Sequence, residues 1–424
     1  METNTKDHSH SMRSTTRQAH IHDLAIVGLG PVGLEAASAS NALGLDVIGF
    51  EATKVGGHVD QWGQVRLFSP FELNAGPAGE QVLINAAKTL PEPDEIMTGA
   101  TFLNNYLQPL ADQLSGSVAL LEGVRVLAVG RQGWLKHEGI DSSARATQPF
   151  RILVEENGNE REVLARSVFD CSGTYGRPNW AGGSGIPARG ERQMRNKIEY
   201  HVPDPTHRNR DKFESSRTLL IGGGHSAATT ALALAELAIE EPKTSFVWAT
   251  RGGGGTQLHP LTNDPLRERA KLVDQIRDLR TNLPSGSEWL TQAQLVAVWA
   301  EGQGIGVEVA VNGDIRRDRF DHIVANVGYE PDDTIYRQLQ IHECYASRGP
   351  MNLATTLLAA SGDGPTDCLS HDGLGKDTIQ NPESGFFILG AKSFGKNSSF
   401  LMRTGYGQVS AALSLIVSEL HFTK

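Results

Sequence analysis

Three glycines near the start of the chain have the spacing of a phosphate-binding turn. Gly28, Gly30 and Gly33 form GxGxxG between a short apolar run, residues 23–27, and a stretch of small residues that favours a helix. In such a turn the first glycine allows the sharp bend, the second lets the backbone approach a pyrophosphate, and the third lets helix and strand pack closely. The amino-terminal end of the helix then faces the phosphates. The pattern predicts a dinucleotide site.

An acidic residue stands where such a site needs one. Glu51 ends the next apolar run, DVIGFEA, and is placed to accept hydrogen bonds from a ribose. A strand, a glycine turn, a helix, a second strand and an acid in this order are far more specific than the glycines alone. A glycine turn followed by an incidental acid is the weaker alternative.

A second unit of the same kind follows later in the chain. Gly222, Gly224 and Ala227 form GxGxxA after the apolar run RTLLI, and the dipeptide His225-Ser226 opens the next helix. The following strand ends in WATR, so that Arg251 stands where an acid would be expected. Because a cation suits a ribose 2′-phosphate and an acid suits a free ribose, the sequence favours NADPH over NADH. A solvated loop arginine is the alternative.

The composition narrows the class of protein. The 424 residues suffice for two to three domains, and a net charge of −10 argues against a nucleic-acid partner. Apolar runs stay shorter than the ~18 residues that span a membrane. None of the three cysteines belongs to a CxxC pair, so neither a dithiol motif nor a zinc site is expected, and a reducing, cytoplasmic setting is favoured. The three are Cys171, Cys344 and Cys368.

Several motifs resemble those of flavin-containing monooxygenases and their thioredoxin-reductase-like relatives. They are GLGPVG with Pro31, Glu51, the GG-x4-W pattern, FDCSGTYGRPNW, which resembles ATG-x-x-x-x-P, and the closing stretch 385–413. The resemblance covers nearly all of residues 21–420. It departs from the family at Ala391, where an aspartate usually follows the glycine. It implies FAD and NADPH as cofactors, held by residues Gly28, Gly30, Pro31, Gly33, Glu51, Gly57, Trp62, Val126, Gly173, Gly222, Gly224, His225, Ser226, Ala227, Arg251, Gly390 and Phe400.

The alternation of strands and helices predicts an α/β fold with two Rossmann-like dinucleotide-binding domains in three layers. We expect a disordered tail over 1–20, a FAD-binding domain over 21–183 and 331–424, and an NADPH-binding domain, 184–330, inserted between its parts. Within these domains, residues 161–173 are expected to supply two strands, and residues 344–383 to be irregular. His8, His10, His20 and His22 could bind a metal, but no carboxylate or thiol is recognised that completes a site, so a solvated tail is the preferred interpretation and no metal site is predicted.

The resemblance implies hydride transfer from NADPH to FAD and leaves the final acceptor open. In a monooxygenase, oxygen and reduced flavin form a C4a-hydroperoxide that oxygenates a small-molecule substrate at sulfur, nitrogen or a carbonyl. Members of that family often use an asparagine after the GG-x-W region to stabilise this species, and Asn74 is the candidate catalytic residue. A turn asparagine that caps the next segment explains Asn74 equally well. The linker motif FxGxxxH is missing, although His201 stands in that region.

Two other functions remain open. A reductase would pass electrons to a disulfide, a quinone or a ferredoxin, without the cysteine pair that disulfide reductases usually carry. A binding or regulatory module would keep the nucleotide fold without turnover, which the intact glycine turns oppose. The family also suggests a homodimer. Lys392, Ser393 and Lys396 fit either contacts to an anionic substrate or a solvated loop.

Overall fold

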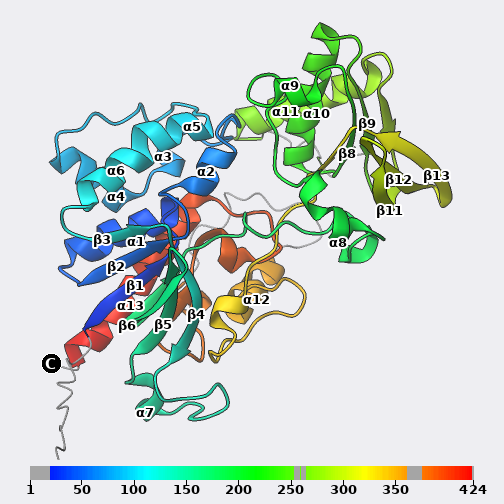
Figure 1. Ribbon diagram of the computed structural model, residues 1–424. Helices are drawn as coiled ribbons and strands as arrows, with labels where there is room; N and C mark the ends of the chain where they lie inside the picture. Colours follow the sequence, from blue (N-terminus) through cyan, green and yellow to red (C-terminus); the bar gives the residue numbers. More distant parts are fainter. Residues whose placement is uncertain (1–19, 253–257, 259–263, 361–374, 423–424) are drawn as a thin grey trace, which may run out of the picture.

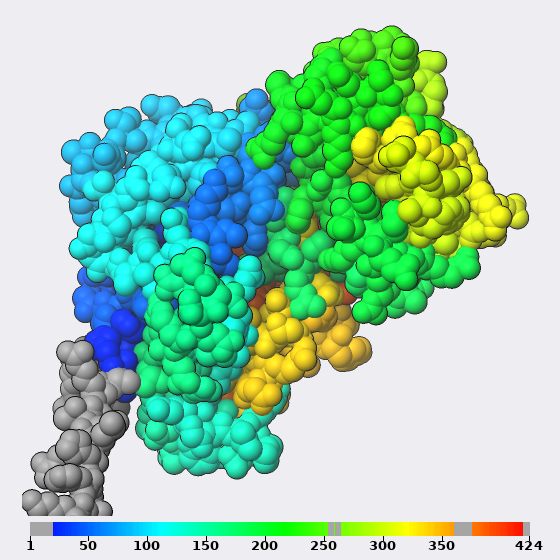
Figure 2. Space-filling view, in the orientation of Figure 1, coloured from blue at the N-terminus to red at the C-terminus, as the bar shows by residue number. Residues whose placement is uncertain are grey.

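The computed structural model describes residues 20–252, 258, 264–360 and 375–422, and it places two sheets in two lobes (Figure 1). The blue, cyan, teal, orange and red segments build one lobe, and the green and yellow segments build the other. The space-filling view shows the same two lobes meeting along one side of each (Figure 2).

The first lobe is organised around a mainly parallel sheet with the strand order β3-β2-β1-β6-β5-β4, in which β15 also pairs with β6. The centre of β1 is completely buried, as expected for a parallel strand that is covered on both faces. The strands are β1 (Ile21–Val27), β2 (Val47–Glu51), β3 (Ala119–Glu122), β4 (Val124–Arg131), β5 (Phe150–Glu156), β6 (Asn159–Asp170) and β15 (Phe386–Ile388).

Helices cover one face of this sheet, and the antiparallel β4-β5-β6 meander folds over the other, which gives three layers. Helix α1 packs against α13, α4 and α6. The segment η1 is a π-helix, joined end to end with α5 and α6. The helices are α1 (Pro31–Ala42), α2 (Gly57–Gln61), α3 (Phe71–Asn74), α4 (Pro77–Asn85), α5 (Gly99–Phe102), η1 (Leu103–Leu107), α6 (Gln108–Leu114), α7 (Ser143–Ala146), η4 (Thr334–Tyr336), α12 (Met351–Ala360), η6 (Lys376–Thr378), η7 (Gly390–Phe394) and α13 (Met402–Phe422).

The second lobe has a parallel sheet of order β10-β9-β8-β14-β7 and a separate antiparallel sheet of order β11-β12-β13. Helices α10 and α11 pack against each other beside the parallel sheet. The strands are β7 (Ile198–Glu199), β8 (Arg217–Ile221), β9 (Ser245–Ala249), β10 (Glu288–Leu290), β11 (Ala293–Glu301), β12 (Gly304–Val311), β13 (Asp314–Phe320) and β14 (His322–Ala325). The helices are η2 (Gly183–Gly185), α8 (Glu191–Met194), η3 (Arg195–Lys197), α9 (Arg210–Phe213), α10 (His225–Glu240) and α11 (Arg267–Thr281).

The chain passes between the lobes twice at one place. Pro178 and Tyr329 form an isolated antiparallel bridge, and the Asn179 N–H donates to the Gly328 carbonyl over 3.0 Å. Strands β7 to β14 lie between these crossings, so the second lobe is inserted into the first. The sequence-based domain limits themselves stay predictions.

Two expectations from the sequence need correction. Residues 161–173 contribute to one long strand, β6, because its first half pairs with β5 and its second half with β1 and β15. The stretch 344–383 contains helix α12, which buries Leu353 and Leu357 on one face. The tail before His20 lies outside the described residues.

Candidate functional site

A cleft of about 660 Å³ opens at the carboxyl ends of β1, β2 and β6. Parallel α/β sheets bind ligands in such a crevice because helix amino termini and loops converge there. Loops from both parts of the first lobe line the cleft, together with residues from the crossings between the lobes.

The first glycine turn forms one wall of this cleft. Gly28 has φ +89°, and a Cβ there would lie 2.7 Å from the Ser172 Cα. A Cβ on Gly33 would lie 1.9 Å from the Gly28 carbonyl oxygen, whereas the space beside Gly30 is open. No side chain caps the amino terminus of α1. Its free N–H groups therefore suit an anion such as a pyrophosphate.

Glu51 presents a carboxylate at the end of β2, inside the cleft. Its Oε2 accepts a hydrogen bond from the Leu29 N–H, and its Oε1 accepts one from the Thr53 N–H, each over 3.0 Å. These bonds fix the orientation of the carboxylate and leave acceptor capacity for further donors, because each carboxylate oxygen has two lone pairs. This arrangement suits the hydroxyl groups of a ribose.

The structure brings most of the predicted cofactor residues of the first domain together. Gly33 does not line the cleft; it packs closely against the Gly28 carbonyl and so supports the turn. The predicted residues that line the cleft are Gly28, Gly30, Pro31, Glu51, Gly57, Trp62, Val126, Gly173, Gly390 and Phe400.

The second glycine turn lies apart from this cleft, at the face of the second lobe that touches the first. Gly222 has φ +139°, and a Cβ there would approach the Asn326 carbonyl oxygen to 2.2 Å. Gly224 precedes helix α10, whose amino terminus carries no side-chain cap. The first residue of that helix, His225, contacts the ring of Phe68 from the first lobe at 5.2 Å between centroids. Ser226 and Ala227 complete the predicted turn.

Arg251 lies two residues beyond β9, at the carboxyl edge of the second parallel sheet, and is exposed. Within the described part of the chain it forms no ion pair with an acid, so its guanidinium is available to a ligand. It follows β9, which pairs with β8, the strand that leads into the glycine turn. Its contact with a 2′-phosphate stays a prediction.

Sequence reasoning missed a group of rings that we call the imidazole–tyrosine cluster: His58, Tyr175, His201 and Tyr329. The Tyr175 ring lies 4.3 Å from the His201 ring, 4.8 Å from Tyr329 and 5.4 Å from His58, between centroids. His201 Nδ1 lies 3.2 Å from the Tyr329 hydroxyl. Three of the four line the cleft. Their only sequence signal is adjacency: His58 follows Gly57, and Tyr175 comes two residues after Gly173.

The cluster is polar but uncharged at neutral pH. Burial lowers the pKa values of His58 and His201, so both imidazoles are neutral and each offers one donor and one acceptor. Burial raises the pKa of Tyr175 to about 12 and that of Tyr329 further, so both phenols stay protonated. The cleft therefore contains hydrogen-bonding rings without a net charge.

Lys392 is neither in a solvated loop nor free to contact an anionic substrate, the two environments that the sequence suggested. It is buried, and its Nζ lies 2.6 Å from Asp170 Oδ2 and 3.0 Å from the Ser172 hydroxyl. Ser393 is also buried and donates to the Gly390 carbonyl over 2.7 Å. Only Lys396 is solvated, with Glu330 at 3.7 Å. Asp170, at the end of β6, gives the lysine the partner that a buried charge requires.

Asn74 is 3% exposed and lies outside the cleft lining. Its Oδ1 accepts from the Ser69 hydroxyl over 2.7 Å, and its Nδ2 donates to the Ser69 carbonyl over 2.8 Å. The amide is thus occupied in closing the turn before α3. This geometry favours a structural role over the catalytic one, but the amide bonds Ser69 upstream and does not cap the next helix, α4, as the alternative expected.

Replacing Asn74 with alanine should therefore lower the free energy of unfolding by about 1–3 kcal/mol, because both Ser69 groups would stay buried without partners. Chemical denaturation measures this change. The matched control is Asn85→Ala, which removes an exposed amide bonded to Gln81 and should be nearly neutral. Full stability of the Asn74 variant combined with loss of turnover would restore the catalytic interpretation.

The cysteines give no dithiol in the described residues. Cys171 lines the cleft, and burial raises the pKa of its thiol. Cys344 is a free cysteine that does not line the cleft, and hydrogen bonds from Ser347 lower its pKa. Cys368 lies outside the described residues.

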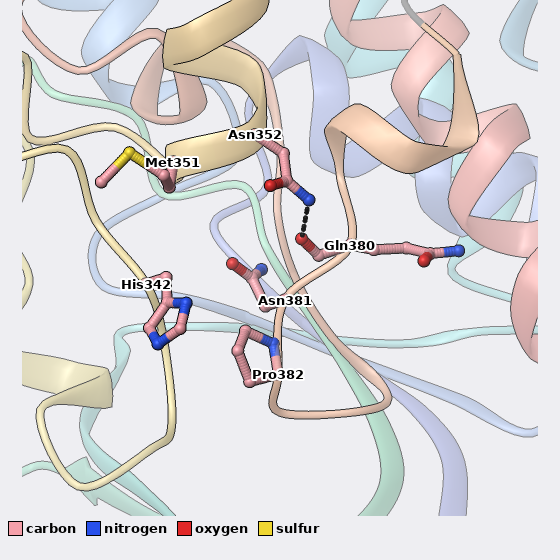
Figure 3. A pocket seen from close by; sticks show the side chains of 6 residues that line it. All are labelled: His342, Met351, Asn352, Gln380, Asn381 and Pro382. Atoms are coloured by element: carbon pink, nitrogen blue, oxygen red, sulfur yellow. Dashed lines mark hydrogen bonds between the residues drawn. The ribbon is translucent and has the colours of Figure 1, made fainter. Parts of the chain in front are cut away.

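A second hollow, of about 240 Å³, lies beside the start of α12. Figure 3 shows its lining side chains, with Asn352 Nδ2 donating to the Gln380 carbonyl over 3.3 Å. It contains one titratable ring and no lysine, arginine or carboxylate, so it offers little for chemistry. Its lining residues are His342, Met351, Asn352, Gln380, Asn381 and Pro382.

Solved structures with the same architecture include three that span nearly the whole chain. The bacillithiol disulfide reductase of Bacillus cereus has 16% identity, covers 94% of this chain and 100% of its own, and gives a TM-score of 0.67. The ornithine N-hydroxylase of Kutzneria sp. 744, solved with reduced FAD, NADP⁺ and L-ornithine, has 16% identity, the same coverage of both chains and a TM-score of 0.62. The thioredoxin reductase of T. acidophilum has 17% identity, covers 94% and 99%, and gives 0.58.

The chain has the two-domain FAD/NAD(P)-binding fold. This confirms the predicted α/β class with two Rossmann-like domains, and both groups named by the sequence resemblance occur among the neighbours. At these identities the likeness concerns the fold alone. No protein-family model matches the chain, and no curated protein matches it. Among the described helices, none is long and apolar enough to cross a bilayer.

Proposed function

We propose that this chain is an NADPH-dependent FAD oxidoreductase. The observation that carries the proposal is the pairing of two glycine turns, each before an uncapped helix, with Glu51 at the end of the strand after the first and Arg251 just beyond the strand after the second. The fold neighbours that contain FAD and NADP⁺ support the same assignment. A cytoplasmic location and a homodimer belong to the proposal as expectations.

The described residues fit both cofactors. The turn at Gly28–Gly33 and the α1 amino terminus would hold the FAD pyrophosphate, and Glu51 would hold the ribose. The turn at 222–227 would hold the NADPH pyrophosphate, and Arg251 the 2′-phosphate. When bound, the two cofactors supply hydride transfer and the activation of oxygen. The protein contributes their orientation and the surroundings of the substrate.

Oxygen is the acceptor that we favour, with oxygenation of a small molecule at sulfur, nitrogen or a carbonyl. Exchange with a disulfide normally uses two thiols, and within the described residues Cys171 is the only cysteine on the cleft, with a raised pKa. The neutral rings of His58, Tyr175 and His201 form one part of the remaining lining. An uncharged, partly enclosed wall favours chemistry that must be kept away from water.

The acidic residues of the cleft narrow the substrate class. Asp332 lies 2.6 Å from Arg177, and Glu330 lies 2.7 Å from Arg348. Because a guanidinium compensates the charge of each carboxylate, the pair attracts an ammonium group less than free carboxylates would. Among the fold neighbours, an ornithine N-hydroxylase and a cadaverine monooxygenase act on amines. We propose instead an uncharged substrate, placed against the imidazole–tyrosine cluster.

A quinone reductase is the second candidate, and the same cluster favours it. A flat ring can stack on Tyr175, and the neutral imidazoles of His58 and His201 can donate hydrogen bonds to carbonyl oxygens. The two functions share the cofactor sites and differ in what consumes the electrons.

Oxygen uptake distinguishes them. The purified protein, saturated with FAD, would be supplied with NADPH and candidate sulfides, uncharged amines, ketones or quinones. Oxygenation predicts that one molecule of O2 is consumed for each NADPH oxidised and each product formed, with little release of peroxide. Quinone reduction predicts equal NADPH oxidation with and without oxygen. Failure to retain FAD or to oxidise NADPH with any acceptor would contradict both and favour a binding module.

Replacing Arg251 with glutamine should reduce kcat/KM for NADPH by roughly 10- to 100-fold, because one charge-assisted contact to the 2′-phosphate is lost. The value for NADH should not change. Steady-state kinetics with both nucleotides measure the ratio. Arg277→Gln, on the exposed face of α11, is the control and should leave both values unchanged. An equal loss for both nucleotides would show that Arg251 does not read the phosphate.

A further inference from the structure

We infer that His20, His22 and Asp46 form a binding site for a divalent transition-metal ion of the zinc class. The three side chains lie at the amino-terminal end of the first sheet, whereas the cleft lies at its carboxyl end. The sequence suggested no carboxylate partner for these histidines; the fold supplies one. The site is independent of the proposed function.

Strand geometry brings the three residues together. His20 immediately precedes β1 and His22 is its second residue, and both side chains point to Asp46 Oδ2. Asp46 immediately precedes β2, which pairs with β1 in parallel through Leu24 and Val47. The Asp46 backbone is held on both sides: its N–H donates to Asp23 Oδ2 over 3.1 Å, and its carbonyl accepts from the Asp23 N–H over 3.0 Å. The backbone of Asp46 is therefore fixed before any ion binds.

The ligand atoms are already close to a coordination shell. His20 Nε2 lies 2.6 Å and His22 Nδ1 lies 3.1 Å from Asp46 Oδ2, and all three ligand atoms lie within 4.8 Å of one another. Zinc–ligand bonds of about 2.1 Å in a tetrahedron place ligand atoms about 3.4 Å apart. A small opening of the exposed His20 side chain reaches this spacing. The two rings meet edge to face, with centroids 4.6 Å apart, so both can direct a nitrogen to one point.

His22 gives an independent indication. Its Nδ1 is buried, and although it lies 3.1 Å from the Asp46 carboxylate it has no partner with the geometry of a hydrogen bond. Buried polar atoms are rarely left in this state. A metal ion would use the lone pair on this nitrogen.

The donor set decides the class of ion. Two imidazoles with one carboxylate suit Zn²⁺, Ni²⁺, Co²⁺ or Cu²⁺, whereas Mg²⁺ and Ca²⁺ prefer oxygen ligands. Three protein ligands leave a coordination position open to water. Because Asp46 and Glu51 stand at opposite ends of β2, about 17 Å apart at 3.3 Å per residue, the ion would not touch the cofactor cleft. Its effect would be to tie the beginning of β1 to β2.

Calorimetric titration of the metal-stripped, FAD-containing protein with ZnCl2 tests the inference. We expect one saturable site for Zn²⁺, none for MgCl2, and a rise in melting temperature with zinc. His22→Ala and Asp46→Asn should each weaken the affinity at least about tenfold, since even the loss of a supporting partner costs that much. The FAD absorbance should stay unchanged throughout.

Two controls make the result decisive. His207→Ala removes another exposed histidine beside an aspartate, at 3.4 Å, and should leave binding intact. A double variant, His8→Ala with His10→Ala, should also bind zinc normally. Zinc binding that survives in Asp46→Asn but is lost in the double variant would overturn the inference and assign the ion to the tail. If zinc does not bind at all, the inference is wrong and the two histidines only form ion pairs with Asp46.

Discussion

Replacing Glu51 with glutamine should produce a folded protein that has lost most of its FAD. Glutamine keeps the shape of the side chain but removes the negative charge that two ribose hydroxyl groups would approach. A hydrogen bond to a charged group contributes about 1.5–3 kcal/mol, so the dissociation constant for FAD should rise roughly 10- to 100-fold. Flavin fluorescence during titration of the apoprotein measures this constant, and circular dichroism verifies the fold.

The neighbouring strand offers a matched control. Glu122 ends β3 as Glu51 ends β2, and its Oε1 accepts from the Val55 N–H over 2.5 Å, but it does not line the cleft. Glu122→Gln therefore removes a similar backbone contact without touching the site, and FAD affinity should be unchanged. If both variants bind FAD as the unaltered protein does, Glu51 does not hold the ribose.

Replacing Glu383 with alanine should destabilise the first lobe severely. Its carboxylate is buried and accepts from Arg131 Nε over 2.9 Å, from Arg145 Nη2 over 2.7 Å and from the Gln340 N–H over 2.9 Å. Removing it leaves two buried guanidinium groups without their acid, which costs about 3–5 kcal/mol. At about 2–4 °C per kcal/mol, the melting temperature should fall by roughly 6–20 °C.

Differential scanning calorimetry gives the comparison. Glu162→Ala breaks the surface ion pair between Glu162 and Arg151, in which each side chain is 53% exposed. This change should shift the melting temperature very little. A similar small shift for Glu383→Ala would mean that the buried network contributes no more than a surface pair.

The same carboxylate makes stability depend on pH. Burial raises the pKa of Glu383, but the hydrogen bonds from Arg145 and Gln340 and the charge of Arg131 outweigh it, so the pKa lies below its usual value. A group with a lowered pKa stabilises the fold above its unfolded pKa, about 4.3, and loses this contribution as the pH falls through the folded value. The difference in unfolding free energy between the protein and Glu383→Ala should therefore be constant near pH 7 and shrink below about pH 4.

Local patterns were sufficient to predict both glycine turns and the strands and helices around them. Gly28 and Gly222 have positive φ, and Gly33 packs on the Gly28 carbonyl, so part of the need for glycine arises within each turn and is visible in the sequence. The close approach of Ser172 to Gly28 and of Asn326 to Gly222 is not. Glu51 is equally local, since the length of one βαβ unit fixes its position. The parallel strands follow from the same local patterns, whereas the expected insertion of one domain into the other depended on the family resemblance.

Contacts between distant segments could not be predicted in this way. The imidazole–tyrosine cluster joins one ring from helix α2 with rings from three separate loops, and no spacing connects His58 with Tyr329. Lys392 finds Asp170 from 222 residues away, so its sequence neighbourhood suggested a solvated loop. Asn74 had two equally local explanations, and only its contacts with Ser69 distinguish them.

The two crossings between the lobes, at Pro178 and Tyr329, determine which lobe is completed first during synthesis. Every strand of the second lobe has been synthesised once β14 is made, whereas the first lobe still lacks β15, which pairs with β6. Arg131 must likewise wait for Glu383, 252 residues later in the chain. Domains fold as units as they emerge. The inserted lobe can therefore finish folding first. The chain then re-enters the first lobe at Tyr329, beside Pro178, where it left. This keeps the unpaired edge of β6 close to β15, the strand that completes the sheet.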